Sequence, residues 1–191
     1  MIRLDGMLMI GSAGTNVGKT ELACAILRKF SRSGEEIAGI KVTTINEKNG
    51  QCPRGGEGCG VCSSLEGVYL ITQETDPASG KDTGRLLAAG ADRVYWLRVL
   101  RTHIERGFAA LLDAVGSEAI SICESNSLRQ VVEPGLFLVA ERKGAKAWKP
   151  SALEVKKYAD RIVVSDGSSF DFDIERLTLE NGKWLLRAQR S

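Results

Sequence analysis

The sequence has neither a long apolar run nor an excess of charge of one sign. No stretch approaches the roughly 18 apolar residues that suggest a membrane-spanning helix. The formal net charge of +2 predicts no strong attraction to nucleic acid or to acidic membranes. The apolar part of residues 1–12 is too short for the core of a signal peptide. We therefore expect a cytoplasmic protein that binds neither nucleic acid nor membranes.

Histidine is nearly absent, and cysteine occurs in an odd number. His103 is the only histidine, and because its segment has helical spacing we expect an exposed or packed side chain there, not a metal ligand. Five cysteines without a secretory signal argue against a disulfide framework. Cys24 falls in a predicted helix and Cys123 in a predicted strand, so both are expected to be buried. The other three cysteines share one glycine-rich segment.

The length and composition fit one globular domain, residues 1–191. A chain of 191 residues, 43% of them hydrophobic, can bury a sizeable core. Segments with helical spacing, such as 19–30, 101–116 and 151–160, alternate with short apolar strands. This order predicts a doubly wound α/β fold with a mainly parallel sheet. We expect the strands at 7–10, 35–42 (ending near Lys41), 92–99, 118–125, 135–142 and 161–167, with a further short one at 67–75.

The end of the chain differs from this pattern. Two runs of alternating apolar residues flank Asn181-Gly182, which is the strongest short signal for a β-hairpin. We therefore expect an antiparallel hairpin at the edge of the sheet.

The segment AGTNVGKT, residues 13–20, joins the first predicted strand to the first predicted helix. It is a Walker A loop with alanine in place of the usual first glycine. Backbone N–H groups of such a loop, with the positive end of the helix, bind phosphate oxygens. Lys19 is expected to reach the β- and γ-phosphates, and Thr20 to hold Mg²⁺. We predict a site for Mg²⁺ with ATP or GTP, whose contacts come from Ala13, Gly14, Thr15, Asn16, Val17, Gly18, Lys19 and Thr20.

The stretch GSAGTNVGKTELACAIL resembles the start of the dethiobiotin synthetase and cobyrinic acid amidase group of P-loop proteins. Their wider class includes the accessory GTPases of molybdopterin-guanine dinucleotide biosynthesis. GIKVTT, GKDTGRLLAAGADRVYWL and ISICES resemble further segments of this class, in the same order, so the resemblance covers roughly residues 7–141. It implies that Lys41 faces the substrate or phosphates and that Glu124 lies near the nucleotide metal. Gly14 replaces the lysine of a related branch that dimerises as a switch, and no Asn-Lys-x-Asp motif identifies the base.

Two carboxylates are candidates for the same site. Glu124 ends the strand AISICE, and Asp82 lies in GKDTGR. Because ligands of open α/β sheets bind at the carboxyl ends of strands, Glu124 is expected to hold Mg²⁺ or orient an attacking water. Asp82 is expected to be a second metal contact or a base, although the first turn of a helix also favours an acid there.

The glycine-rich segment places Cys52, Cys59 and Cys62 within an insertion at about 45–66. The spacing Cys-x6-Cys-x2-Cys suits Zn²⁺ or an iron–sulfur cluster. A fourth ligand would come from Cys123, His103, a substrate or a second subunit of a homodimer. The alternative is a surface loop with reactive thiols or a redox pair.

Together these features predict a Mg²⁺-dependent P-loop NTPase in the synthesis or maturation of a cofactor, of a metal or molybdopterin type. Its second substrate is an unidentified small molecule or cofactor. One alternative is an ATP-dependent ligase resembling dethiobiotin synthetase, in which Lys41 holds a carboxylate. The other is a metal or iron–sulfur carrier that uses the nucleotide only to change conformation.

Overall fold

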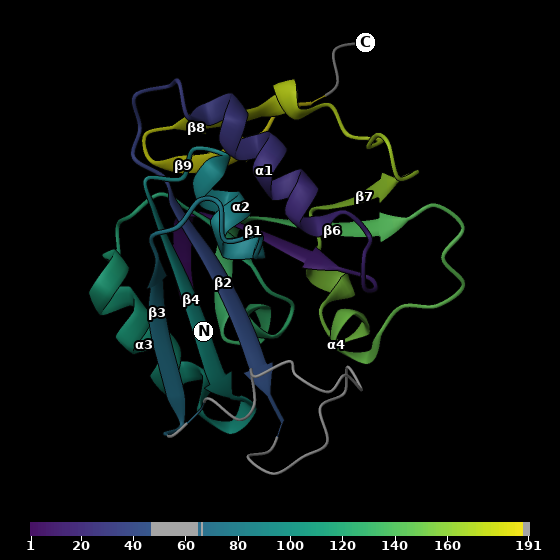
Figure 1. The fold of residues 1–191 in the computed structure, drawn as a ribbon. Helices are drawn as coiled ribbons and strands as arrows, with labels where there is room; N and C mark the ends of the chain where they lie inside the picture. The colour runs from purple at the N-terminus through teal and green to yellow at the C-terminus, as the bar shows by residue number, and fades with distance from the viewer. Residues whose placement is uncertain (47–64, 66, 189–191) are drawn as a thin grey trace.

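The computed structural model describes residues 1–46, 65 and 67–188. Within these residues, seven strands form one twisted sheet in the order β3-β4-β2-β5-β1-β6-β7 (Figure 1). All neighbouring strands are parallel except β3 and β4, which are antiparallel. The strands are β1 (Ile2–Ser12), β2 (Ala38–Ile45), β3 (Tyr69–Glu74), β4 (Arg93–Leu100), β5 (Ser121–Glu124), β6 (Val132–Arg142) and β7 (Arg161–Ser165).

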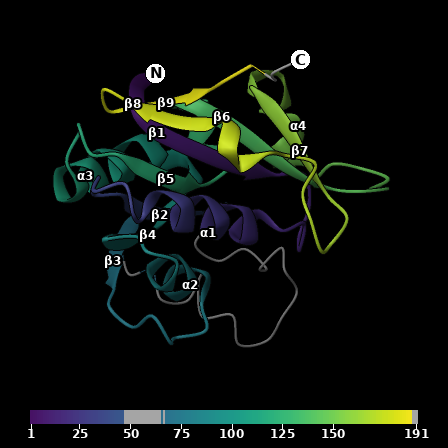
Figure 2. The same cartoon turned by 90° about the horizontal axis from the view of Figure 1, so that it is seen from above.

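Helices cover both faces of the sheet. The helices α1 (Lys19–Phe30) and α2 (Asp82–Ala88) lie on one face, and α3 (Ile104–Val115) lies on the other. Seen from above, α2 and α3 lie on opposite sides of β4 (Figure 2). The remaining helical turns are α4 (Pro150–Leu153), η1 (Arg101–His103), η2 (Ser127–Gln130), η3 (Lys156–Tyr158) and η4 (Ile174–Arg176).

Alternation along the central strands divides the core in two. Leu8 and Ile10 of β1 pack in the cluster that contains α1, whereas Met7 and Met9 pack in the cluster that contains Phe108 of α3. A parallel strand covered on both faces is apolar throughout, as these residues are. The predicted mixed α/β fold with a mainly parallel sheet is therefore confirmed.

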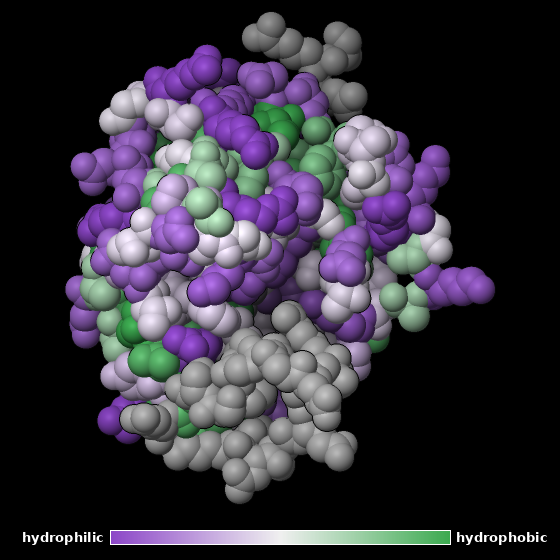
Figure 3. All heavy atoms as spheres, in the orientation of Figure 1, coloured by the Kyte–Doolittle hydropathy of each residue, from purple (hydrophilic) through white to green (hydrophobic). Residues whose placement is uncertain are grey.

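Most of the face shown in Figure 3 is hydrophilic, with apolar side chains only in small patches. Among the described residues, no helix combines the length and apolarity needed to cross a bilayer.

Several predicted boundaries are wrong. The strand β1 begins at Ile2, because its amino-terminal half pairs with β6 although Arg3 and Asp5 break the apolar run. The strand β2 continues to Ile45, so Lys41 lies inside the strand and not at its end. The helix predicted at 151–160 is only the single turn α4 followed by η3.

The carboxyl-terminal hairpin forms as predicted but in a different place. The strands β8 (Leu177–Glu180) and β9 (Lys183–Leu186) are antiparallel, and Asn181 and Gly182 have φ of 52° and 72°, which fits a type I′ turn. They form a separate two-stranded sheet instead of extending the main sheet at its edge. The reason is Trp184, which is buried. Its ring centroid lies 4.9 Å from that of Phe30, and its indole N–H donates a hydrogen bond to the Gly6 carbonyl.

Candidate functional site

The loop between β1 and α1 contains two residues with a left-handed backbone conformation. Asn16 and Gly18 adopt left-handed φ values of 53° and 88°. Gly18 is the N-cap of α1 and has no side chain that could cap the helix, so the N-cap leaves the first N–H groups of α1 without a side-chain acceptor. A Cβ at Gly18 would lie 3.2 Å from the Phe170 ring, so the loop and the segment after β7 are in close contact.

Lys19 and Glu124 form an ion pair below this loop. The Lys19 Nζ atom lies 3.3 Å from Glu124 Oε2, and the Glu124 side chain is 0% exposed. Neither oxygen of Glu124 has a hydrogen-bond partner in the part of the chain that the structure describes. Since a buried carboxylate is normally hydrogen-bonded, this residue has unused capacity to bind a cation or a donor.

A second ion pair lies beside the first. Strand register places Glu124 opposite Lys41, and the Lys41 ammonium donates a hydrogen bond to Asp82, the first residue of α2. Burial opposes ionisation of Asp82, but the hydrogen bond and charge of Lys41 outweigh it and lower the pKa of Asp82. The charges of Lys19 and Arg85 act in the same direction.

The structure therefore brings together four charged side chains that the sequence singled out: Lys19, Lys41, Asp82 and Glu124. Thr20 follows Lys19 in the first turn of α1 and is buried, whereas Thr15 and Asn16 are exposed. Ala13 and Val17 are buried at the base of the loop, and Gly14 is partly exposed.

Two residues that the sequence analysis missed hold the start of the loop. The Asn126 amide accepts a hydrogen bond from the Ser12 N–H at 2.7 Å and donates one to the Ser12 carbonyl at 3.0 Å. The Lys149 backbone N–H donates to the Ala13 carbonyl at 2.8 Å, and its ammonium donates to Ser12 Oγ at 3.0 Å. A Cβ at Gly11 would lie 2.8 Å from the Asn126 side chain, so glycine permits this approach.

The cysteines divide into two groups. Cys52, Cys59 and Cys62 lie outside the described residues, so their predicted metal site stays a prediction. Cys24 and Cys123 are buried, as expected. Cys123 packs in the core on the α3 side, and burial raises the pKa of its thiol, which disfavours the thiolate that a metal ligand needs.

The described residues give little support for a metal site built from histidine, cysteine, aspartate or glutamate side chains. Within the described ranges, no group of three or more His, Cys, Asp or Glu side chains is close enough to hold a metal ion. His103 ends η1, its side chain is partly exposed, and its Nδ1 lies 3.0 Å from Oγ1 of the neighbouring Thr102.

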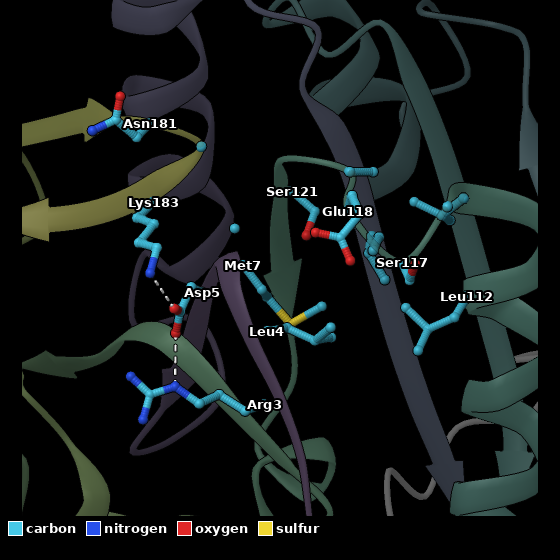
Figure 4. Close-up of a pocket in the computed structure, with 16 residues that line it drawn as sticks. Arg3, Leu4, Asp5, Met7, Leu112, Ser117, Glu118, Ser121, Asn181 and Lys183 are labelled. Carbon is cyan, nitrogen blue, oxygen red and sulfur yellow. Dashed lines mark hydrogen bonds and ion pairs between the residues drawn. The ribbon is translucent and has the colours of Figure 1, made fainter.

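A cavity of about 550 Å³ lies away from the loop, near the amino-terminal half of β1. In Figure 4, Asp5 lies between Lys183 and Arg3, with ion-pair distances of 2.9 Å to each, and Leu112 lies on the opposite side. These charges are satisfied by one another and are partly exposed.

Comparison with known proteins gives one informative similarity. The chain is similar to the cobyric acid synthase of Moorella thermoacetica. The two are 27% identical over 188 residues, an alignment that covers 83% of this chain and 36% of the synthase. The chain thus spans about a third of the length of that relative. No protein-family model and no solved structure matches the chain.

This distant similarity agrees with the resemblance of the sequence to the cobyrinic acid amidase group. The mainly parallel sheet, with the glycine-containing loop directly between β1 and α1, also fits a P-loop type of fold.

Proposed function

We propose that the protein binds a nucleoside triphosphate with Mg²⁺ and hydrolyses it or transfers its γ-phosphoryl group. The observation that carries the proposal is the buried Glu124, which has no hydrogen bond within the described residues and lies 3.3 Å from Lys19 of the loop. Burying an ionised carboxylate without hydrogen bonds destabilises a fold. Binding of a ligand by the Glu124 carboxylate would explain this arrangement.

The residues present fit a Mg²⁺ ion. Magnesium prefers oxygen ligands and keeps several waters, so it needs few protein ligands. The Thr20 hydroxyl and the carboxylates of Glu124 and Asp82 would hold it, directly or through water. When bound, the ion would offset negative charge on the β- and γ-phosphates.

The chain's own residues supply the rest of the phosphate site. The N–H groups at the start of α1 and the Lys19 ammonium attract the phosphate oxygens, and these donors are fixed because Asn126 and Lys149 hold the preceding backbone. The lowered pKa of Asp82 makes it a weak base at neutral pH. Of the two roles predicted for Asp82, contact with the metal is therefore favoured over proton abstraction.

The biological setting that we propose is cofactor synthesis. The similarity to a cobyric acid synthase supports this setting. It also supports the ligase alternative, in which Lys41 holds an acidic substrate near the γ-phosphate. The position of Lys41 beside Asp82 and opposite Glu124 suits that role.

Native mass spectrometry of anaerobically purified protein tests the proposal. After addition of Mg²⁺ and a non-hydrolysable analogue of ATP or GTP, we expect an adduct of one nucleotide and one Mg²⁺ per chain. The same spectra report the number of subunits and so show whether the chain forms a homodimer that could share a metal site. If neither the ATP analogue nor the GTP analogue gives an adduct, the nucleotide site is refuted.

The cysteine prediction has a separate test. If Cys52, Cys59 and Cys62 bind Zn²⁺ or an iron–sulfur cluster, replacing Cys59 and Cys62 by serine should remove the metal from the purified protein. Elemental analysis of wild type and variant gives the answer, with Cys24→Ser as the control. Equal metal content in wild type and the double variant would exclude the site.

A further inference from the structure

The cavity near the amino end of β1 exists because two neighbouring strands start at different heights. The strand β5 begins only at Ser121, which pairs with Met7 of β1. Residues 3–6 of β1 precede this pairing, and the cavity beside them is completed by residues 116–119, which connect α3 to β5, and by residues 181–183 of the hairpin. Its volume of about 550 Å³ is typical of cavities that hold small organic ligands.

The part of the cavity that is formed by strands and α3 is apolar. Leu4 and Met7 come from β1, Ile40 from β2, and Leu112 and Val115 from α3. Three of these side chains are buried in the core, whereas Leu4 and Leu112 are only partly buried and face each other across the cavity (Figure 4). An apolar group placed between Leu4 and Leu112 would remove them from water, which is favourable.

The charged side chains that line the cavity differ in their partners. On one side, Asp5 lies 2.9 Å from Arg3 Nε and 2.9 Å from Lys183 Nζ, and Arg3 also lies 3.4 Å from Glu133. Two carboxylates thus neutralise two cations. On the other side, Glu118 has no ion-pair partner in the part of the chain that the structure describes. Its charge is therefore available to a ligand.

Hydrogen-bond acceptors predominate on the side of Glu118. In Figure 4 the Glu118 carboxylate points into the cavity, on the side where Met7 lies. A Cβ at Gly6 would lie 3.1 Å from the Gly182 carbonyl oxygen and 3.4 Å from the Ala119 carbonyl oxygen, so both oxygens lie at the wall beside Gly6. Carboxylate and carbonyl oxygens accept hydrogen bonds, which an ammonium group donates. The polar part of the cavity therefore suits a cation.

We propose that this cavity binds a small organic cation with an apolar body, whose ammonium group pairs with Glu118. The apolar body lies between Leu4 and Leu112, and the ammonium group makes a charge-assisted hydrogen bond to the carboxylate. An anionic ligand is disfavoured, because the two cations at the rim already share a carboxylate. The site is separate from the nucleotide site and does not depend on it.

An NMR titration of ¹⁵N-labelled protein tests the site with three probes. Cyclohexylammonium, cyclohexanol and cyclohexanecarboxylate carry the same ring and differ in the charge of the polar group. We expect cyclohexylammonium to bind about fivefold or more tightly than either of the others, because it alone can form the charge-assisted contact. The amide signals of residues 4–7 and 116–121 should shift, and those of residues 13–20 should not.

Variants separate the contact with Glu118 from general effects of charge. In Glu118→Gln, a change at an exposed residue, cyclohexylammonium should bind no more tightly than cyclohexanol, and Glu118→Asp should keep part of the preference. Leu112→Trp should weaken the binding of all three probes by filling the cavity. Glu105→Gln removes an exposed carboxylate from the first turn of α3, and this control should keep the full preference.

Three results would overturn the proposal. In wild type, these are equal binding of the three probes, or tightest binding of cyclohexanecarboxylate. In folded Glu118→Gln, it is an unchanged preference for cyclohexylammonium.

Discussion

Two lysine–carboxylate pairs lie near opposite ends of β1, and their surroundings differ. At the carboxyl end, Lys19 faces Glu124, whose side chain is 0% exposed and has no hydrogen-bond partner among the described residues. Near the amino end, Lys183 faces Asp5, whose side chain is 29% exposed and also pairs with Arg3. The exposed pair is satisfied and contributes little to stability.

The proposed function accounts for this difference. A buried ion pair with unsatisfied oxygens is often less stable than an apolar replacement, so stability alone does not explain Lys19 and Glu124. A buried polar group without a hydrogen-bond partner calls for an explanation, and a bound ligand supplies one.

The largest effect is expected for Glu124→Gln. The variant should lose Mg²⁺-dependent turnover by on the order of 100-fold or more, because it removes the charge that the proposed function places beside the phosphates and the metal. Its free energy of unfolding should fall as well, since the variant leaves the Lys19 ammonium without its carboxylate partner. Steady-state kinetics and chemical denaturation measure the two quantities.

Glu133→Gln, on the exposed part of β6, is the control and should change neither turnover nor stability appreciably. Full turnover in Glu124→Gln, combined with lower stability, would mean that Glu124 is a structural residue.

A smaller effect is expected for Asp82→Asn. The Mg²⁺ concentration for half-maximal turnover should increase by about tenfold, as for loss of an outer metal contact. Metal titrations of the activity measure this shift, and Asp113→Asn on the exposed side of α3 is the control. If the Mg²⁺ concentration for half-maximal turnover is unchanged in Asp82→Asn, Asp82 does not contact the metal.

The pH dependence of the Lys41–Asp82 pair follows from the lowered pKa of Asp82. Its ordinary value is 3.8, and the value in the folded protein lies below that. The pair therefore stabilises the fold fully above about pH 4, and this contribution is lost as the pH falls through the lower pKa. Between pH 5 and 8 Asp82 should stay ionised, so the pH profiles of turnover in wild type and Asp82→Asn should have the same shape. A step in the wild-type profile that is missing from the variant would contradict the lowered pKa of Asp82.

The smallest effect is expected for Lys183→Ala. Asp5 keeps Arg3 as a partner, so the free energy of unfolding should change by less than about 1 kcal/mol. Triphosphate affinity should be unchanged, because the pair lies near the opposite end of β1. Denaturation curves and nucleotide titration check both statements, and a marked loss of affinity would show that the two ends are coupled.

Local patterns predicted much of the fold and part of the site. The Walker A segment marks the turn into α1, and Asn181-Gly182 marks the hairpin turn, because both signals depend on neighbouring residues. The place of the hairpin depends on Trp184 packing against Phe30, which no local pattern contains.

The residues that escaped prediction are joined by long-range contacts. Asn126 binds Ser12 across 114 positions, and Lys149 contacts the same residue across 137. The pairing of Trp96 with Thr43 across 53 positions arises only from strand order and register. Such contacts need the sheet topology, which a single sequence does not supply.

The most direct test of the central claim is an equilibrium titration of wild type and Lys19→Ala with a non-hydrolysable triphosphate in the presence of Mg²⁺. The account predicts one site per chain in wild type and a loss of affinity of at least about 100-fold in the variant, equivalent to about 2.8 kcal/mol. Equal affinities in two folded proteins would contradict it.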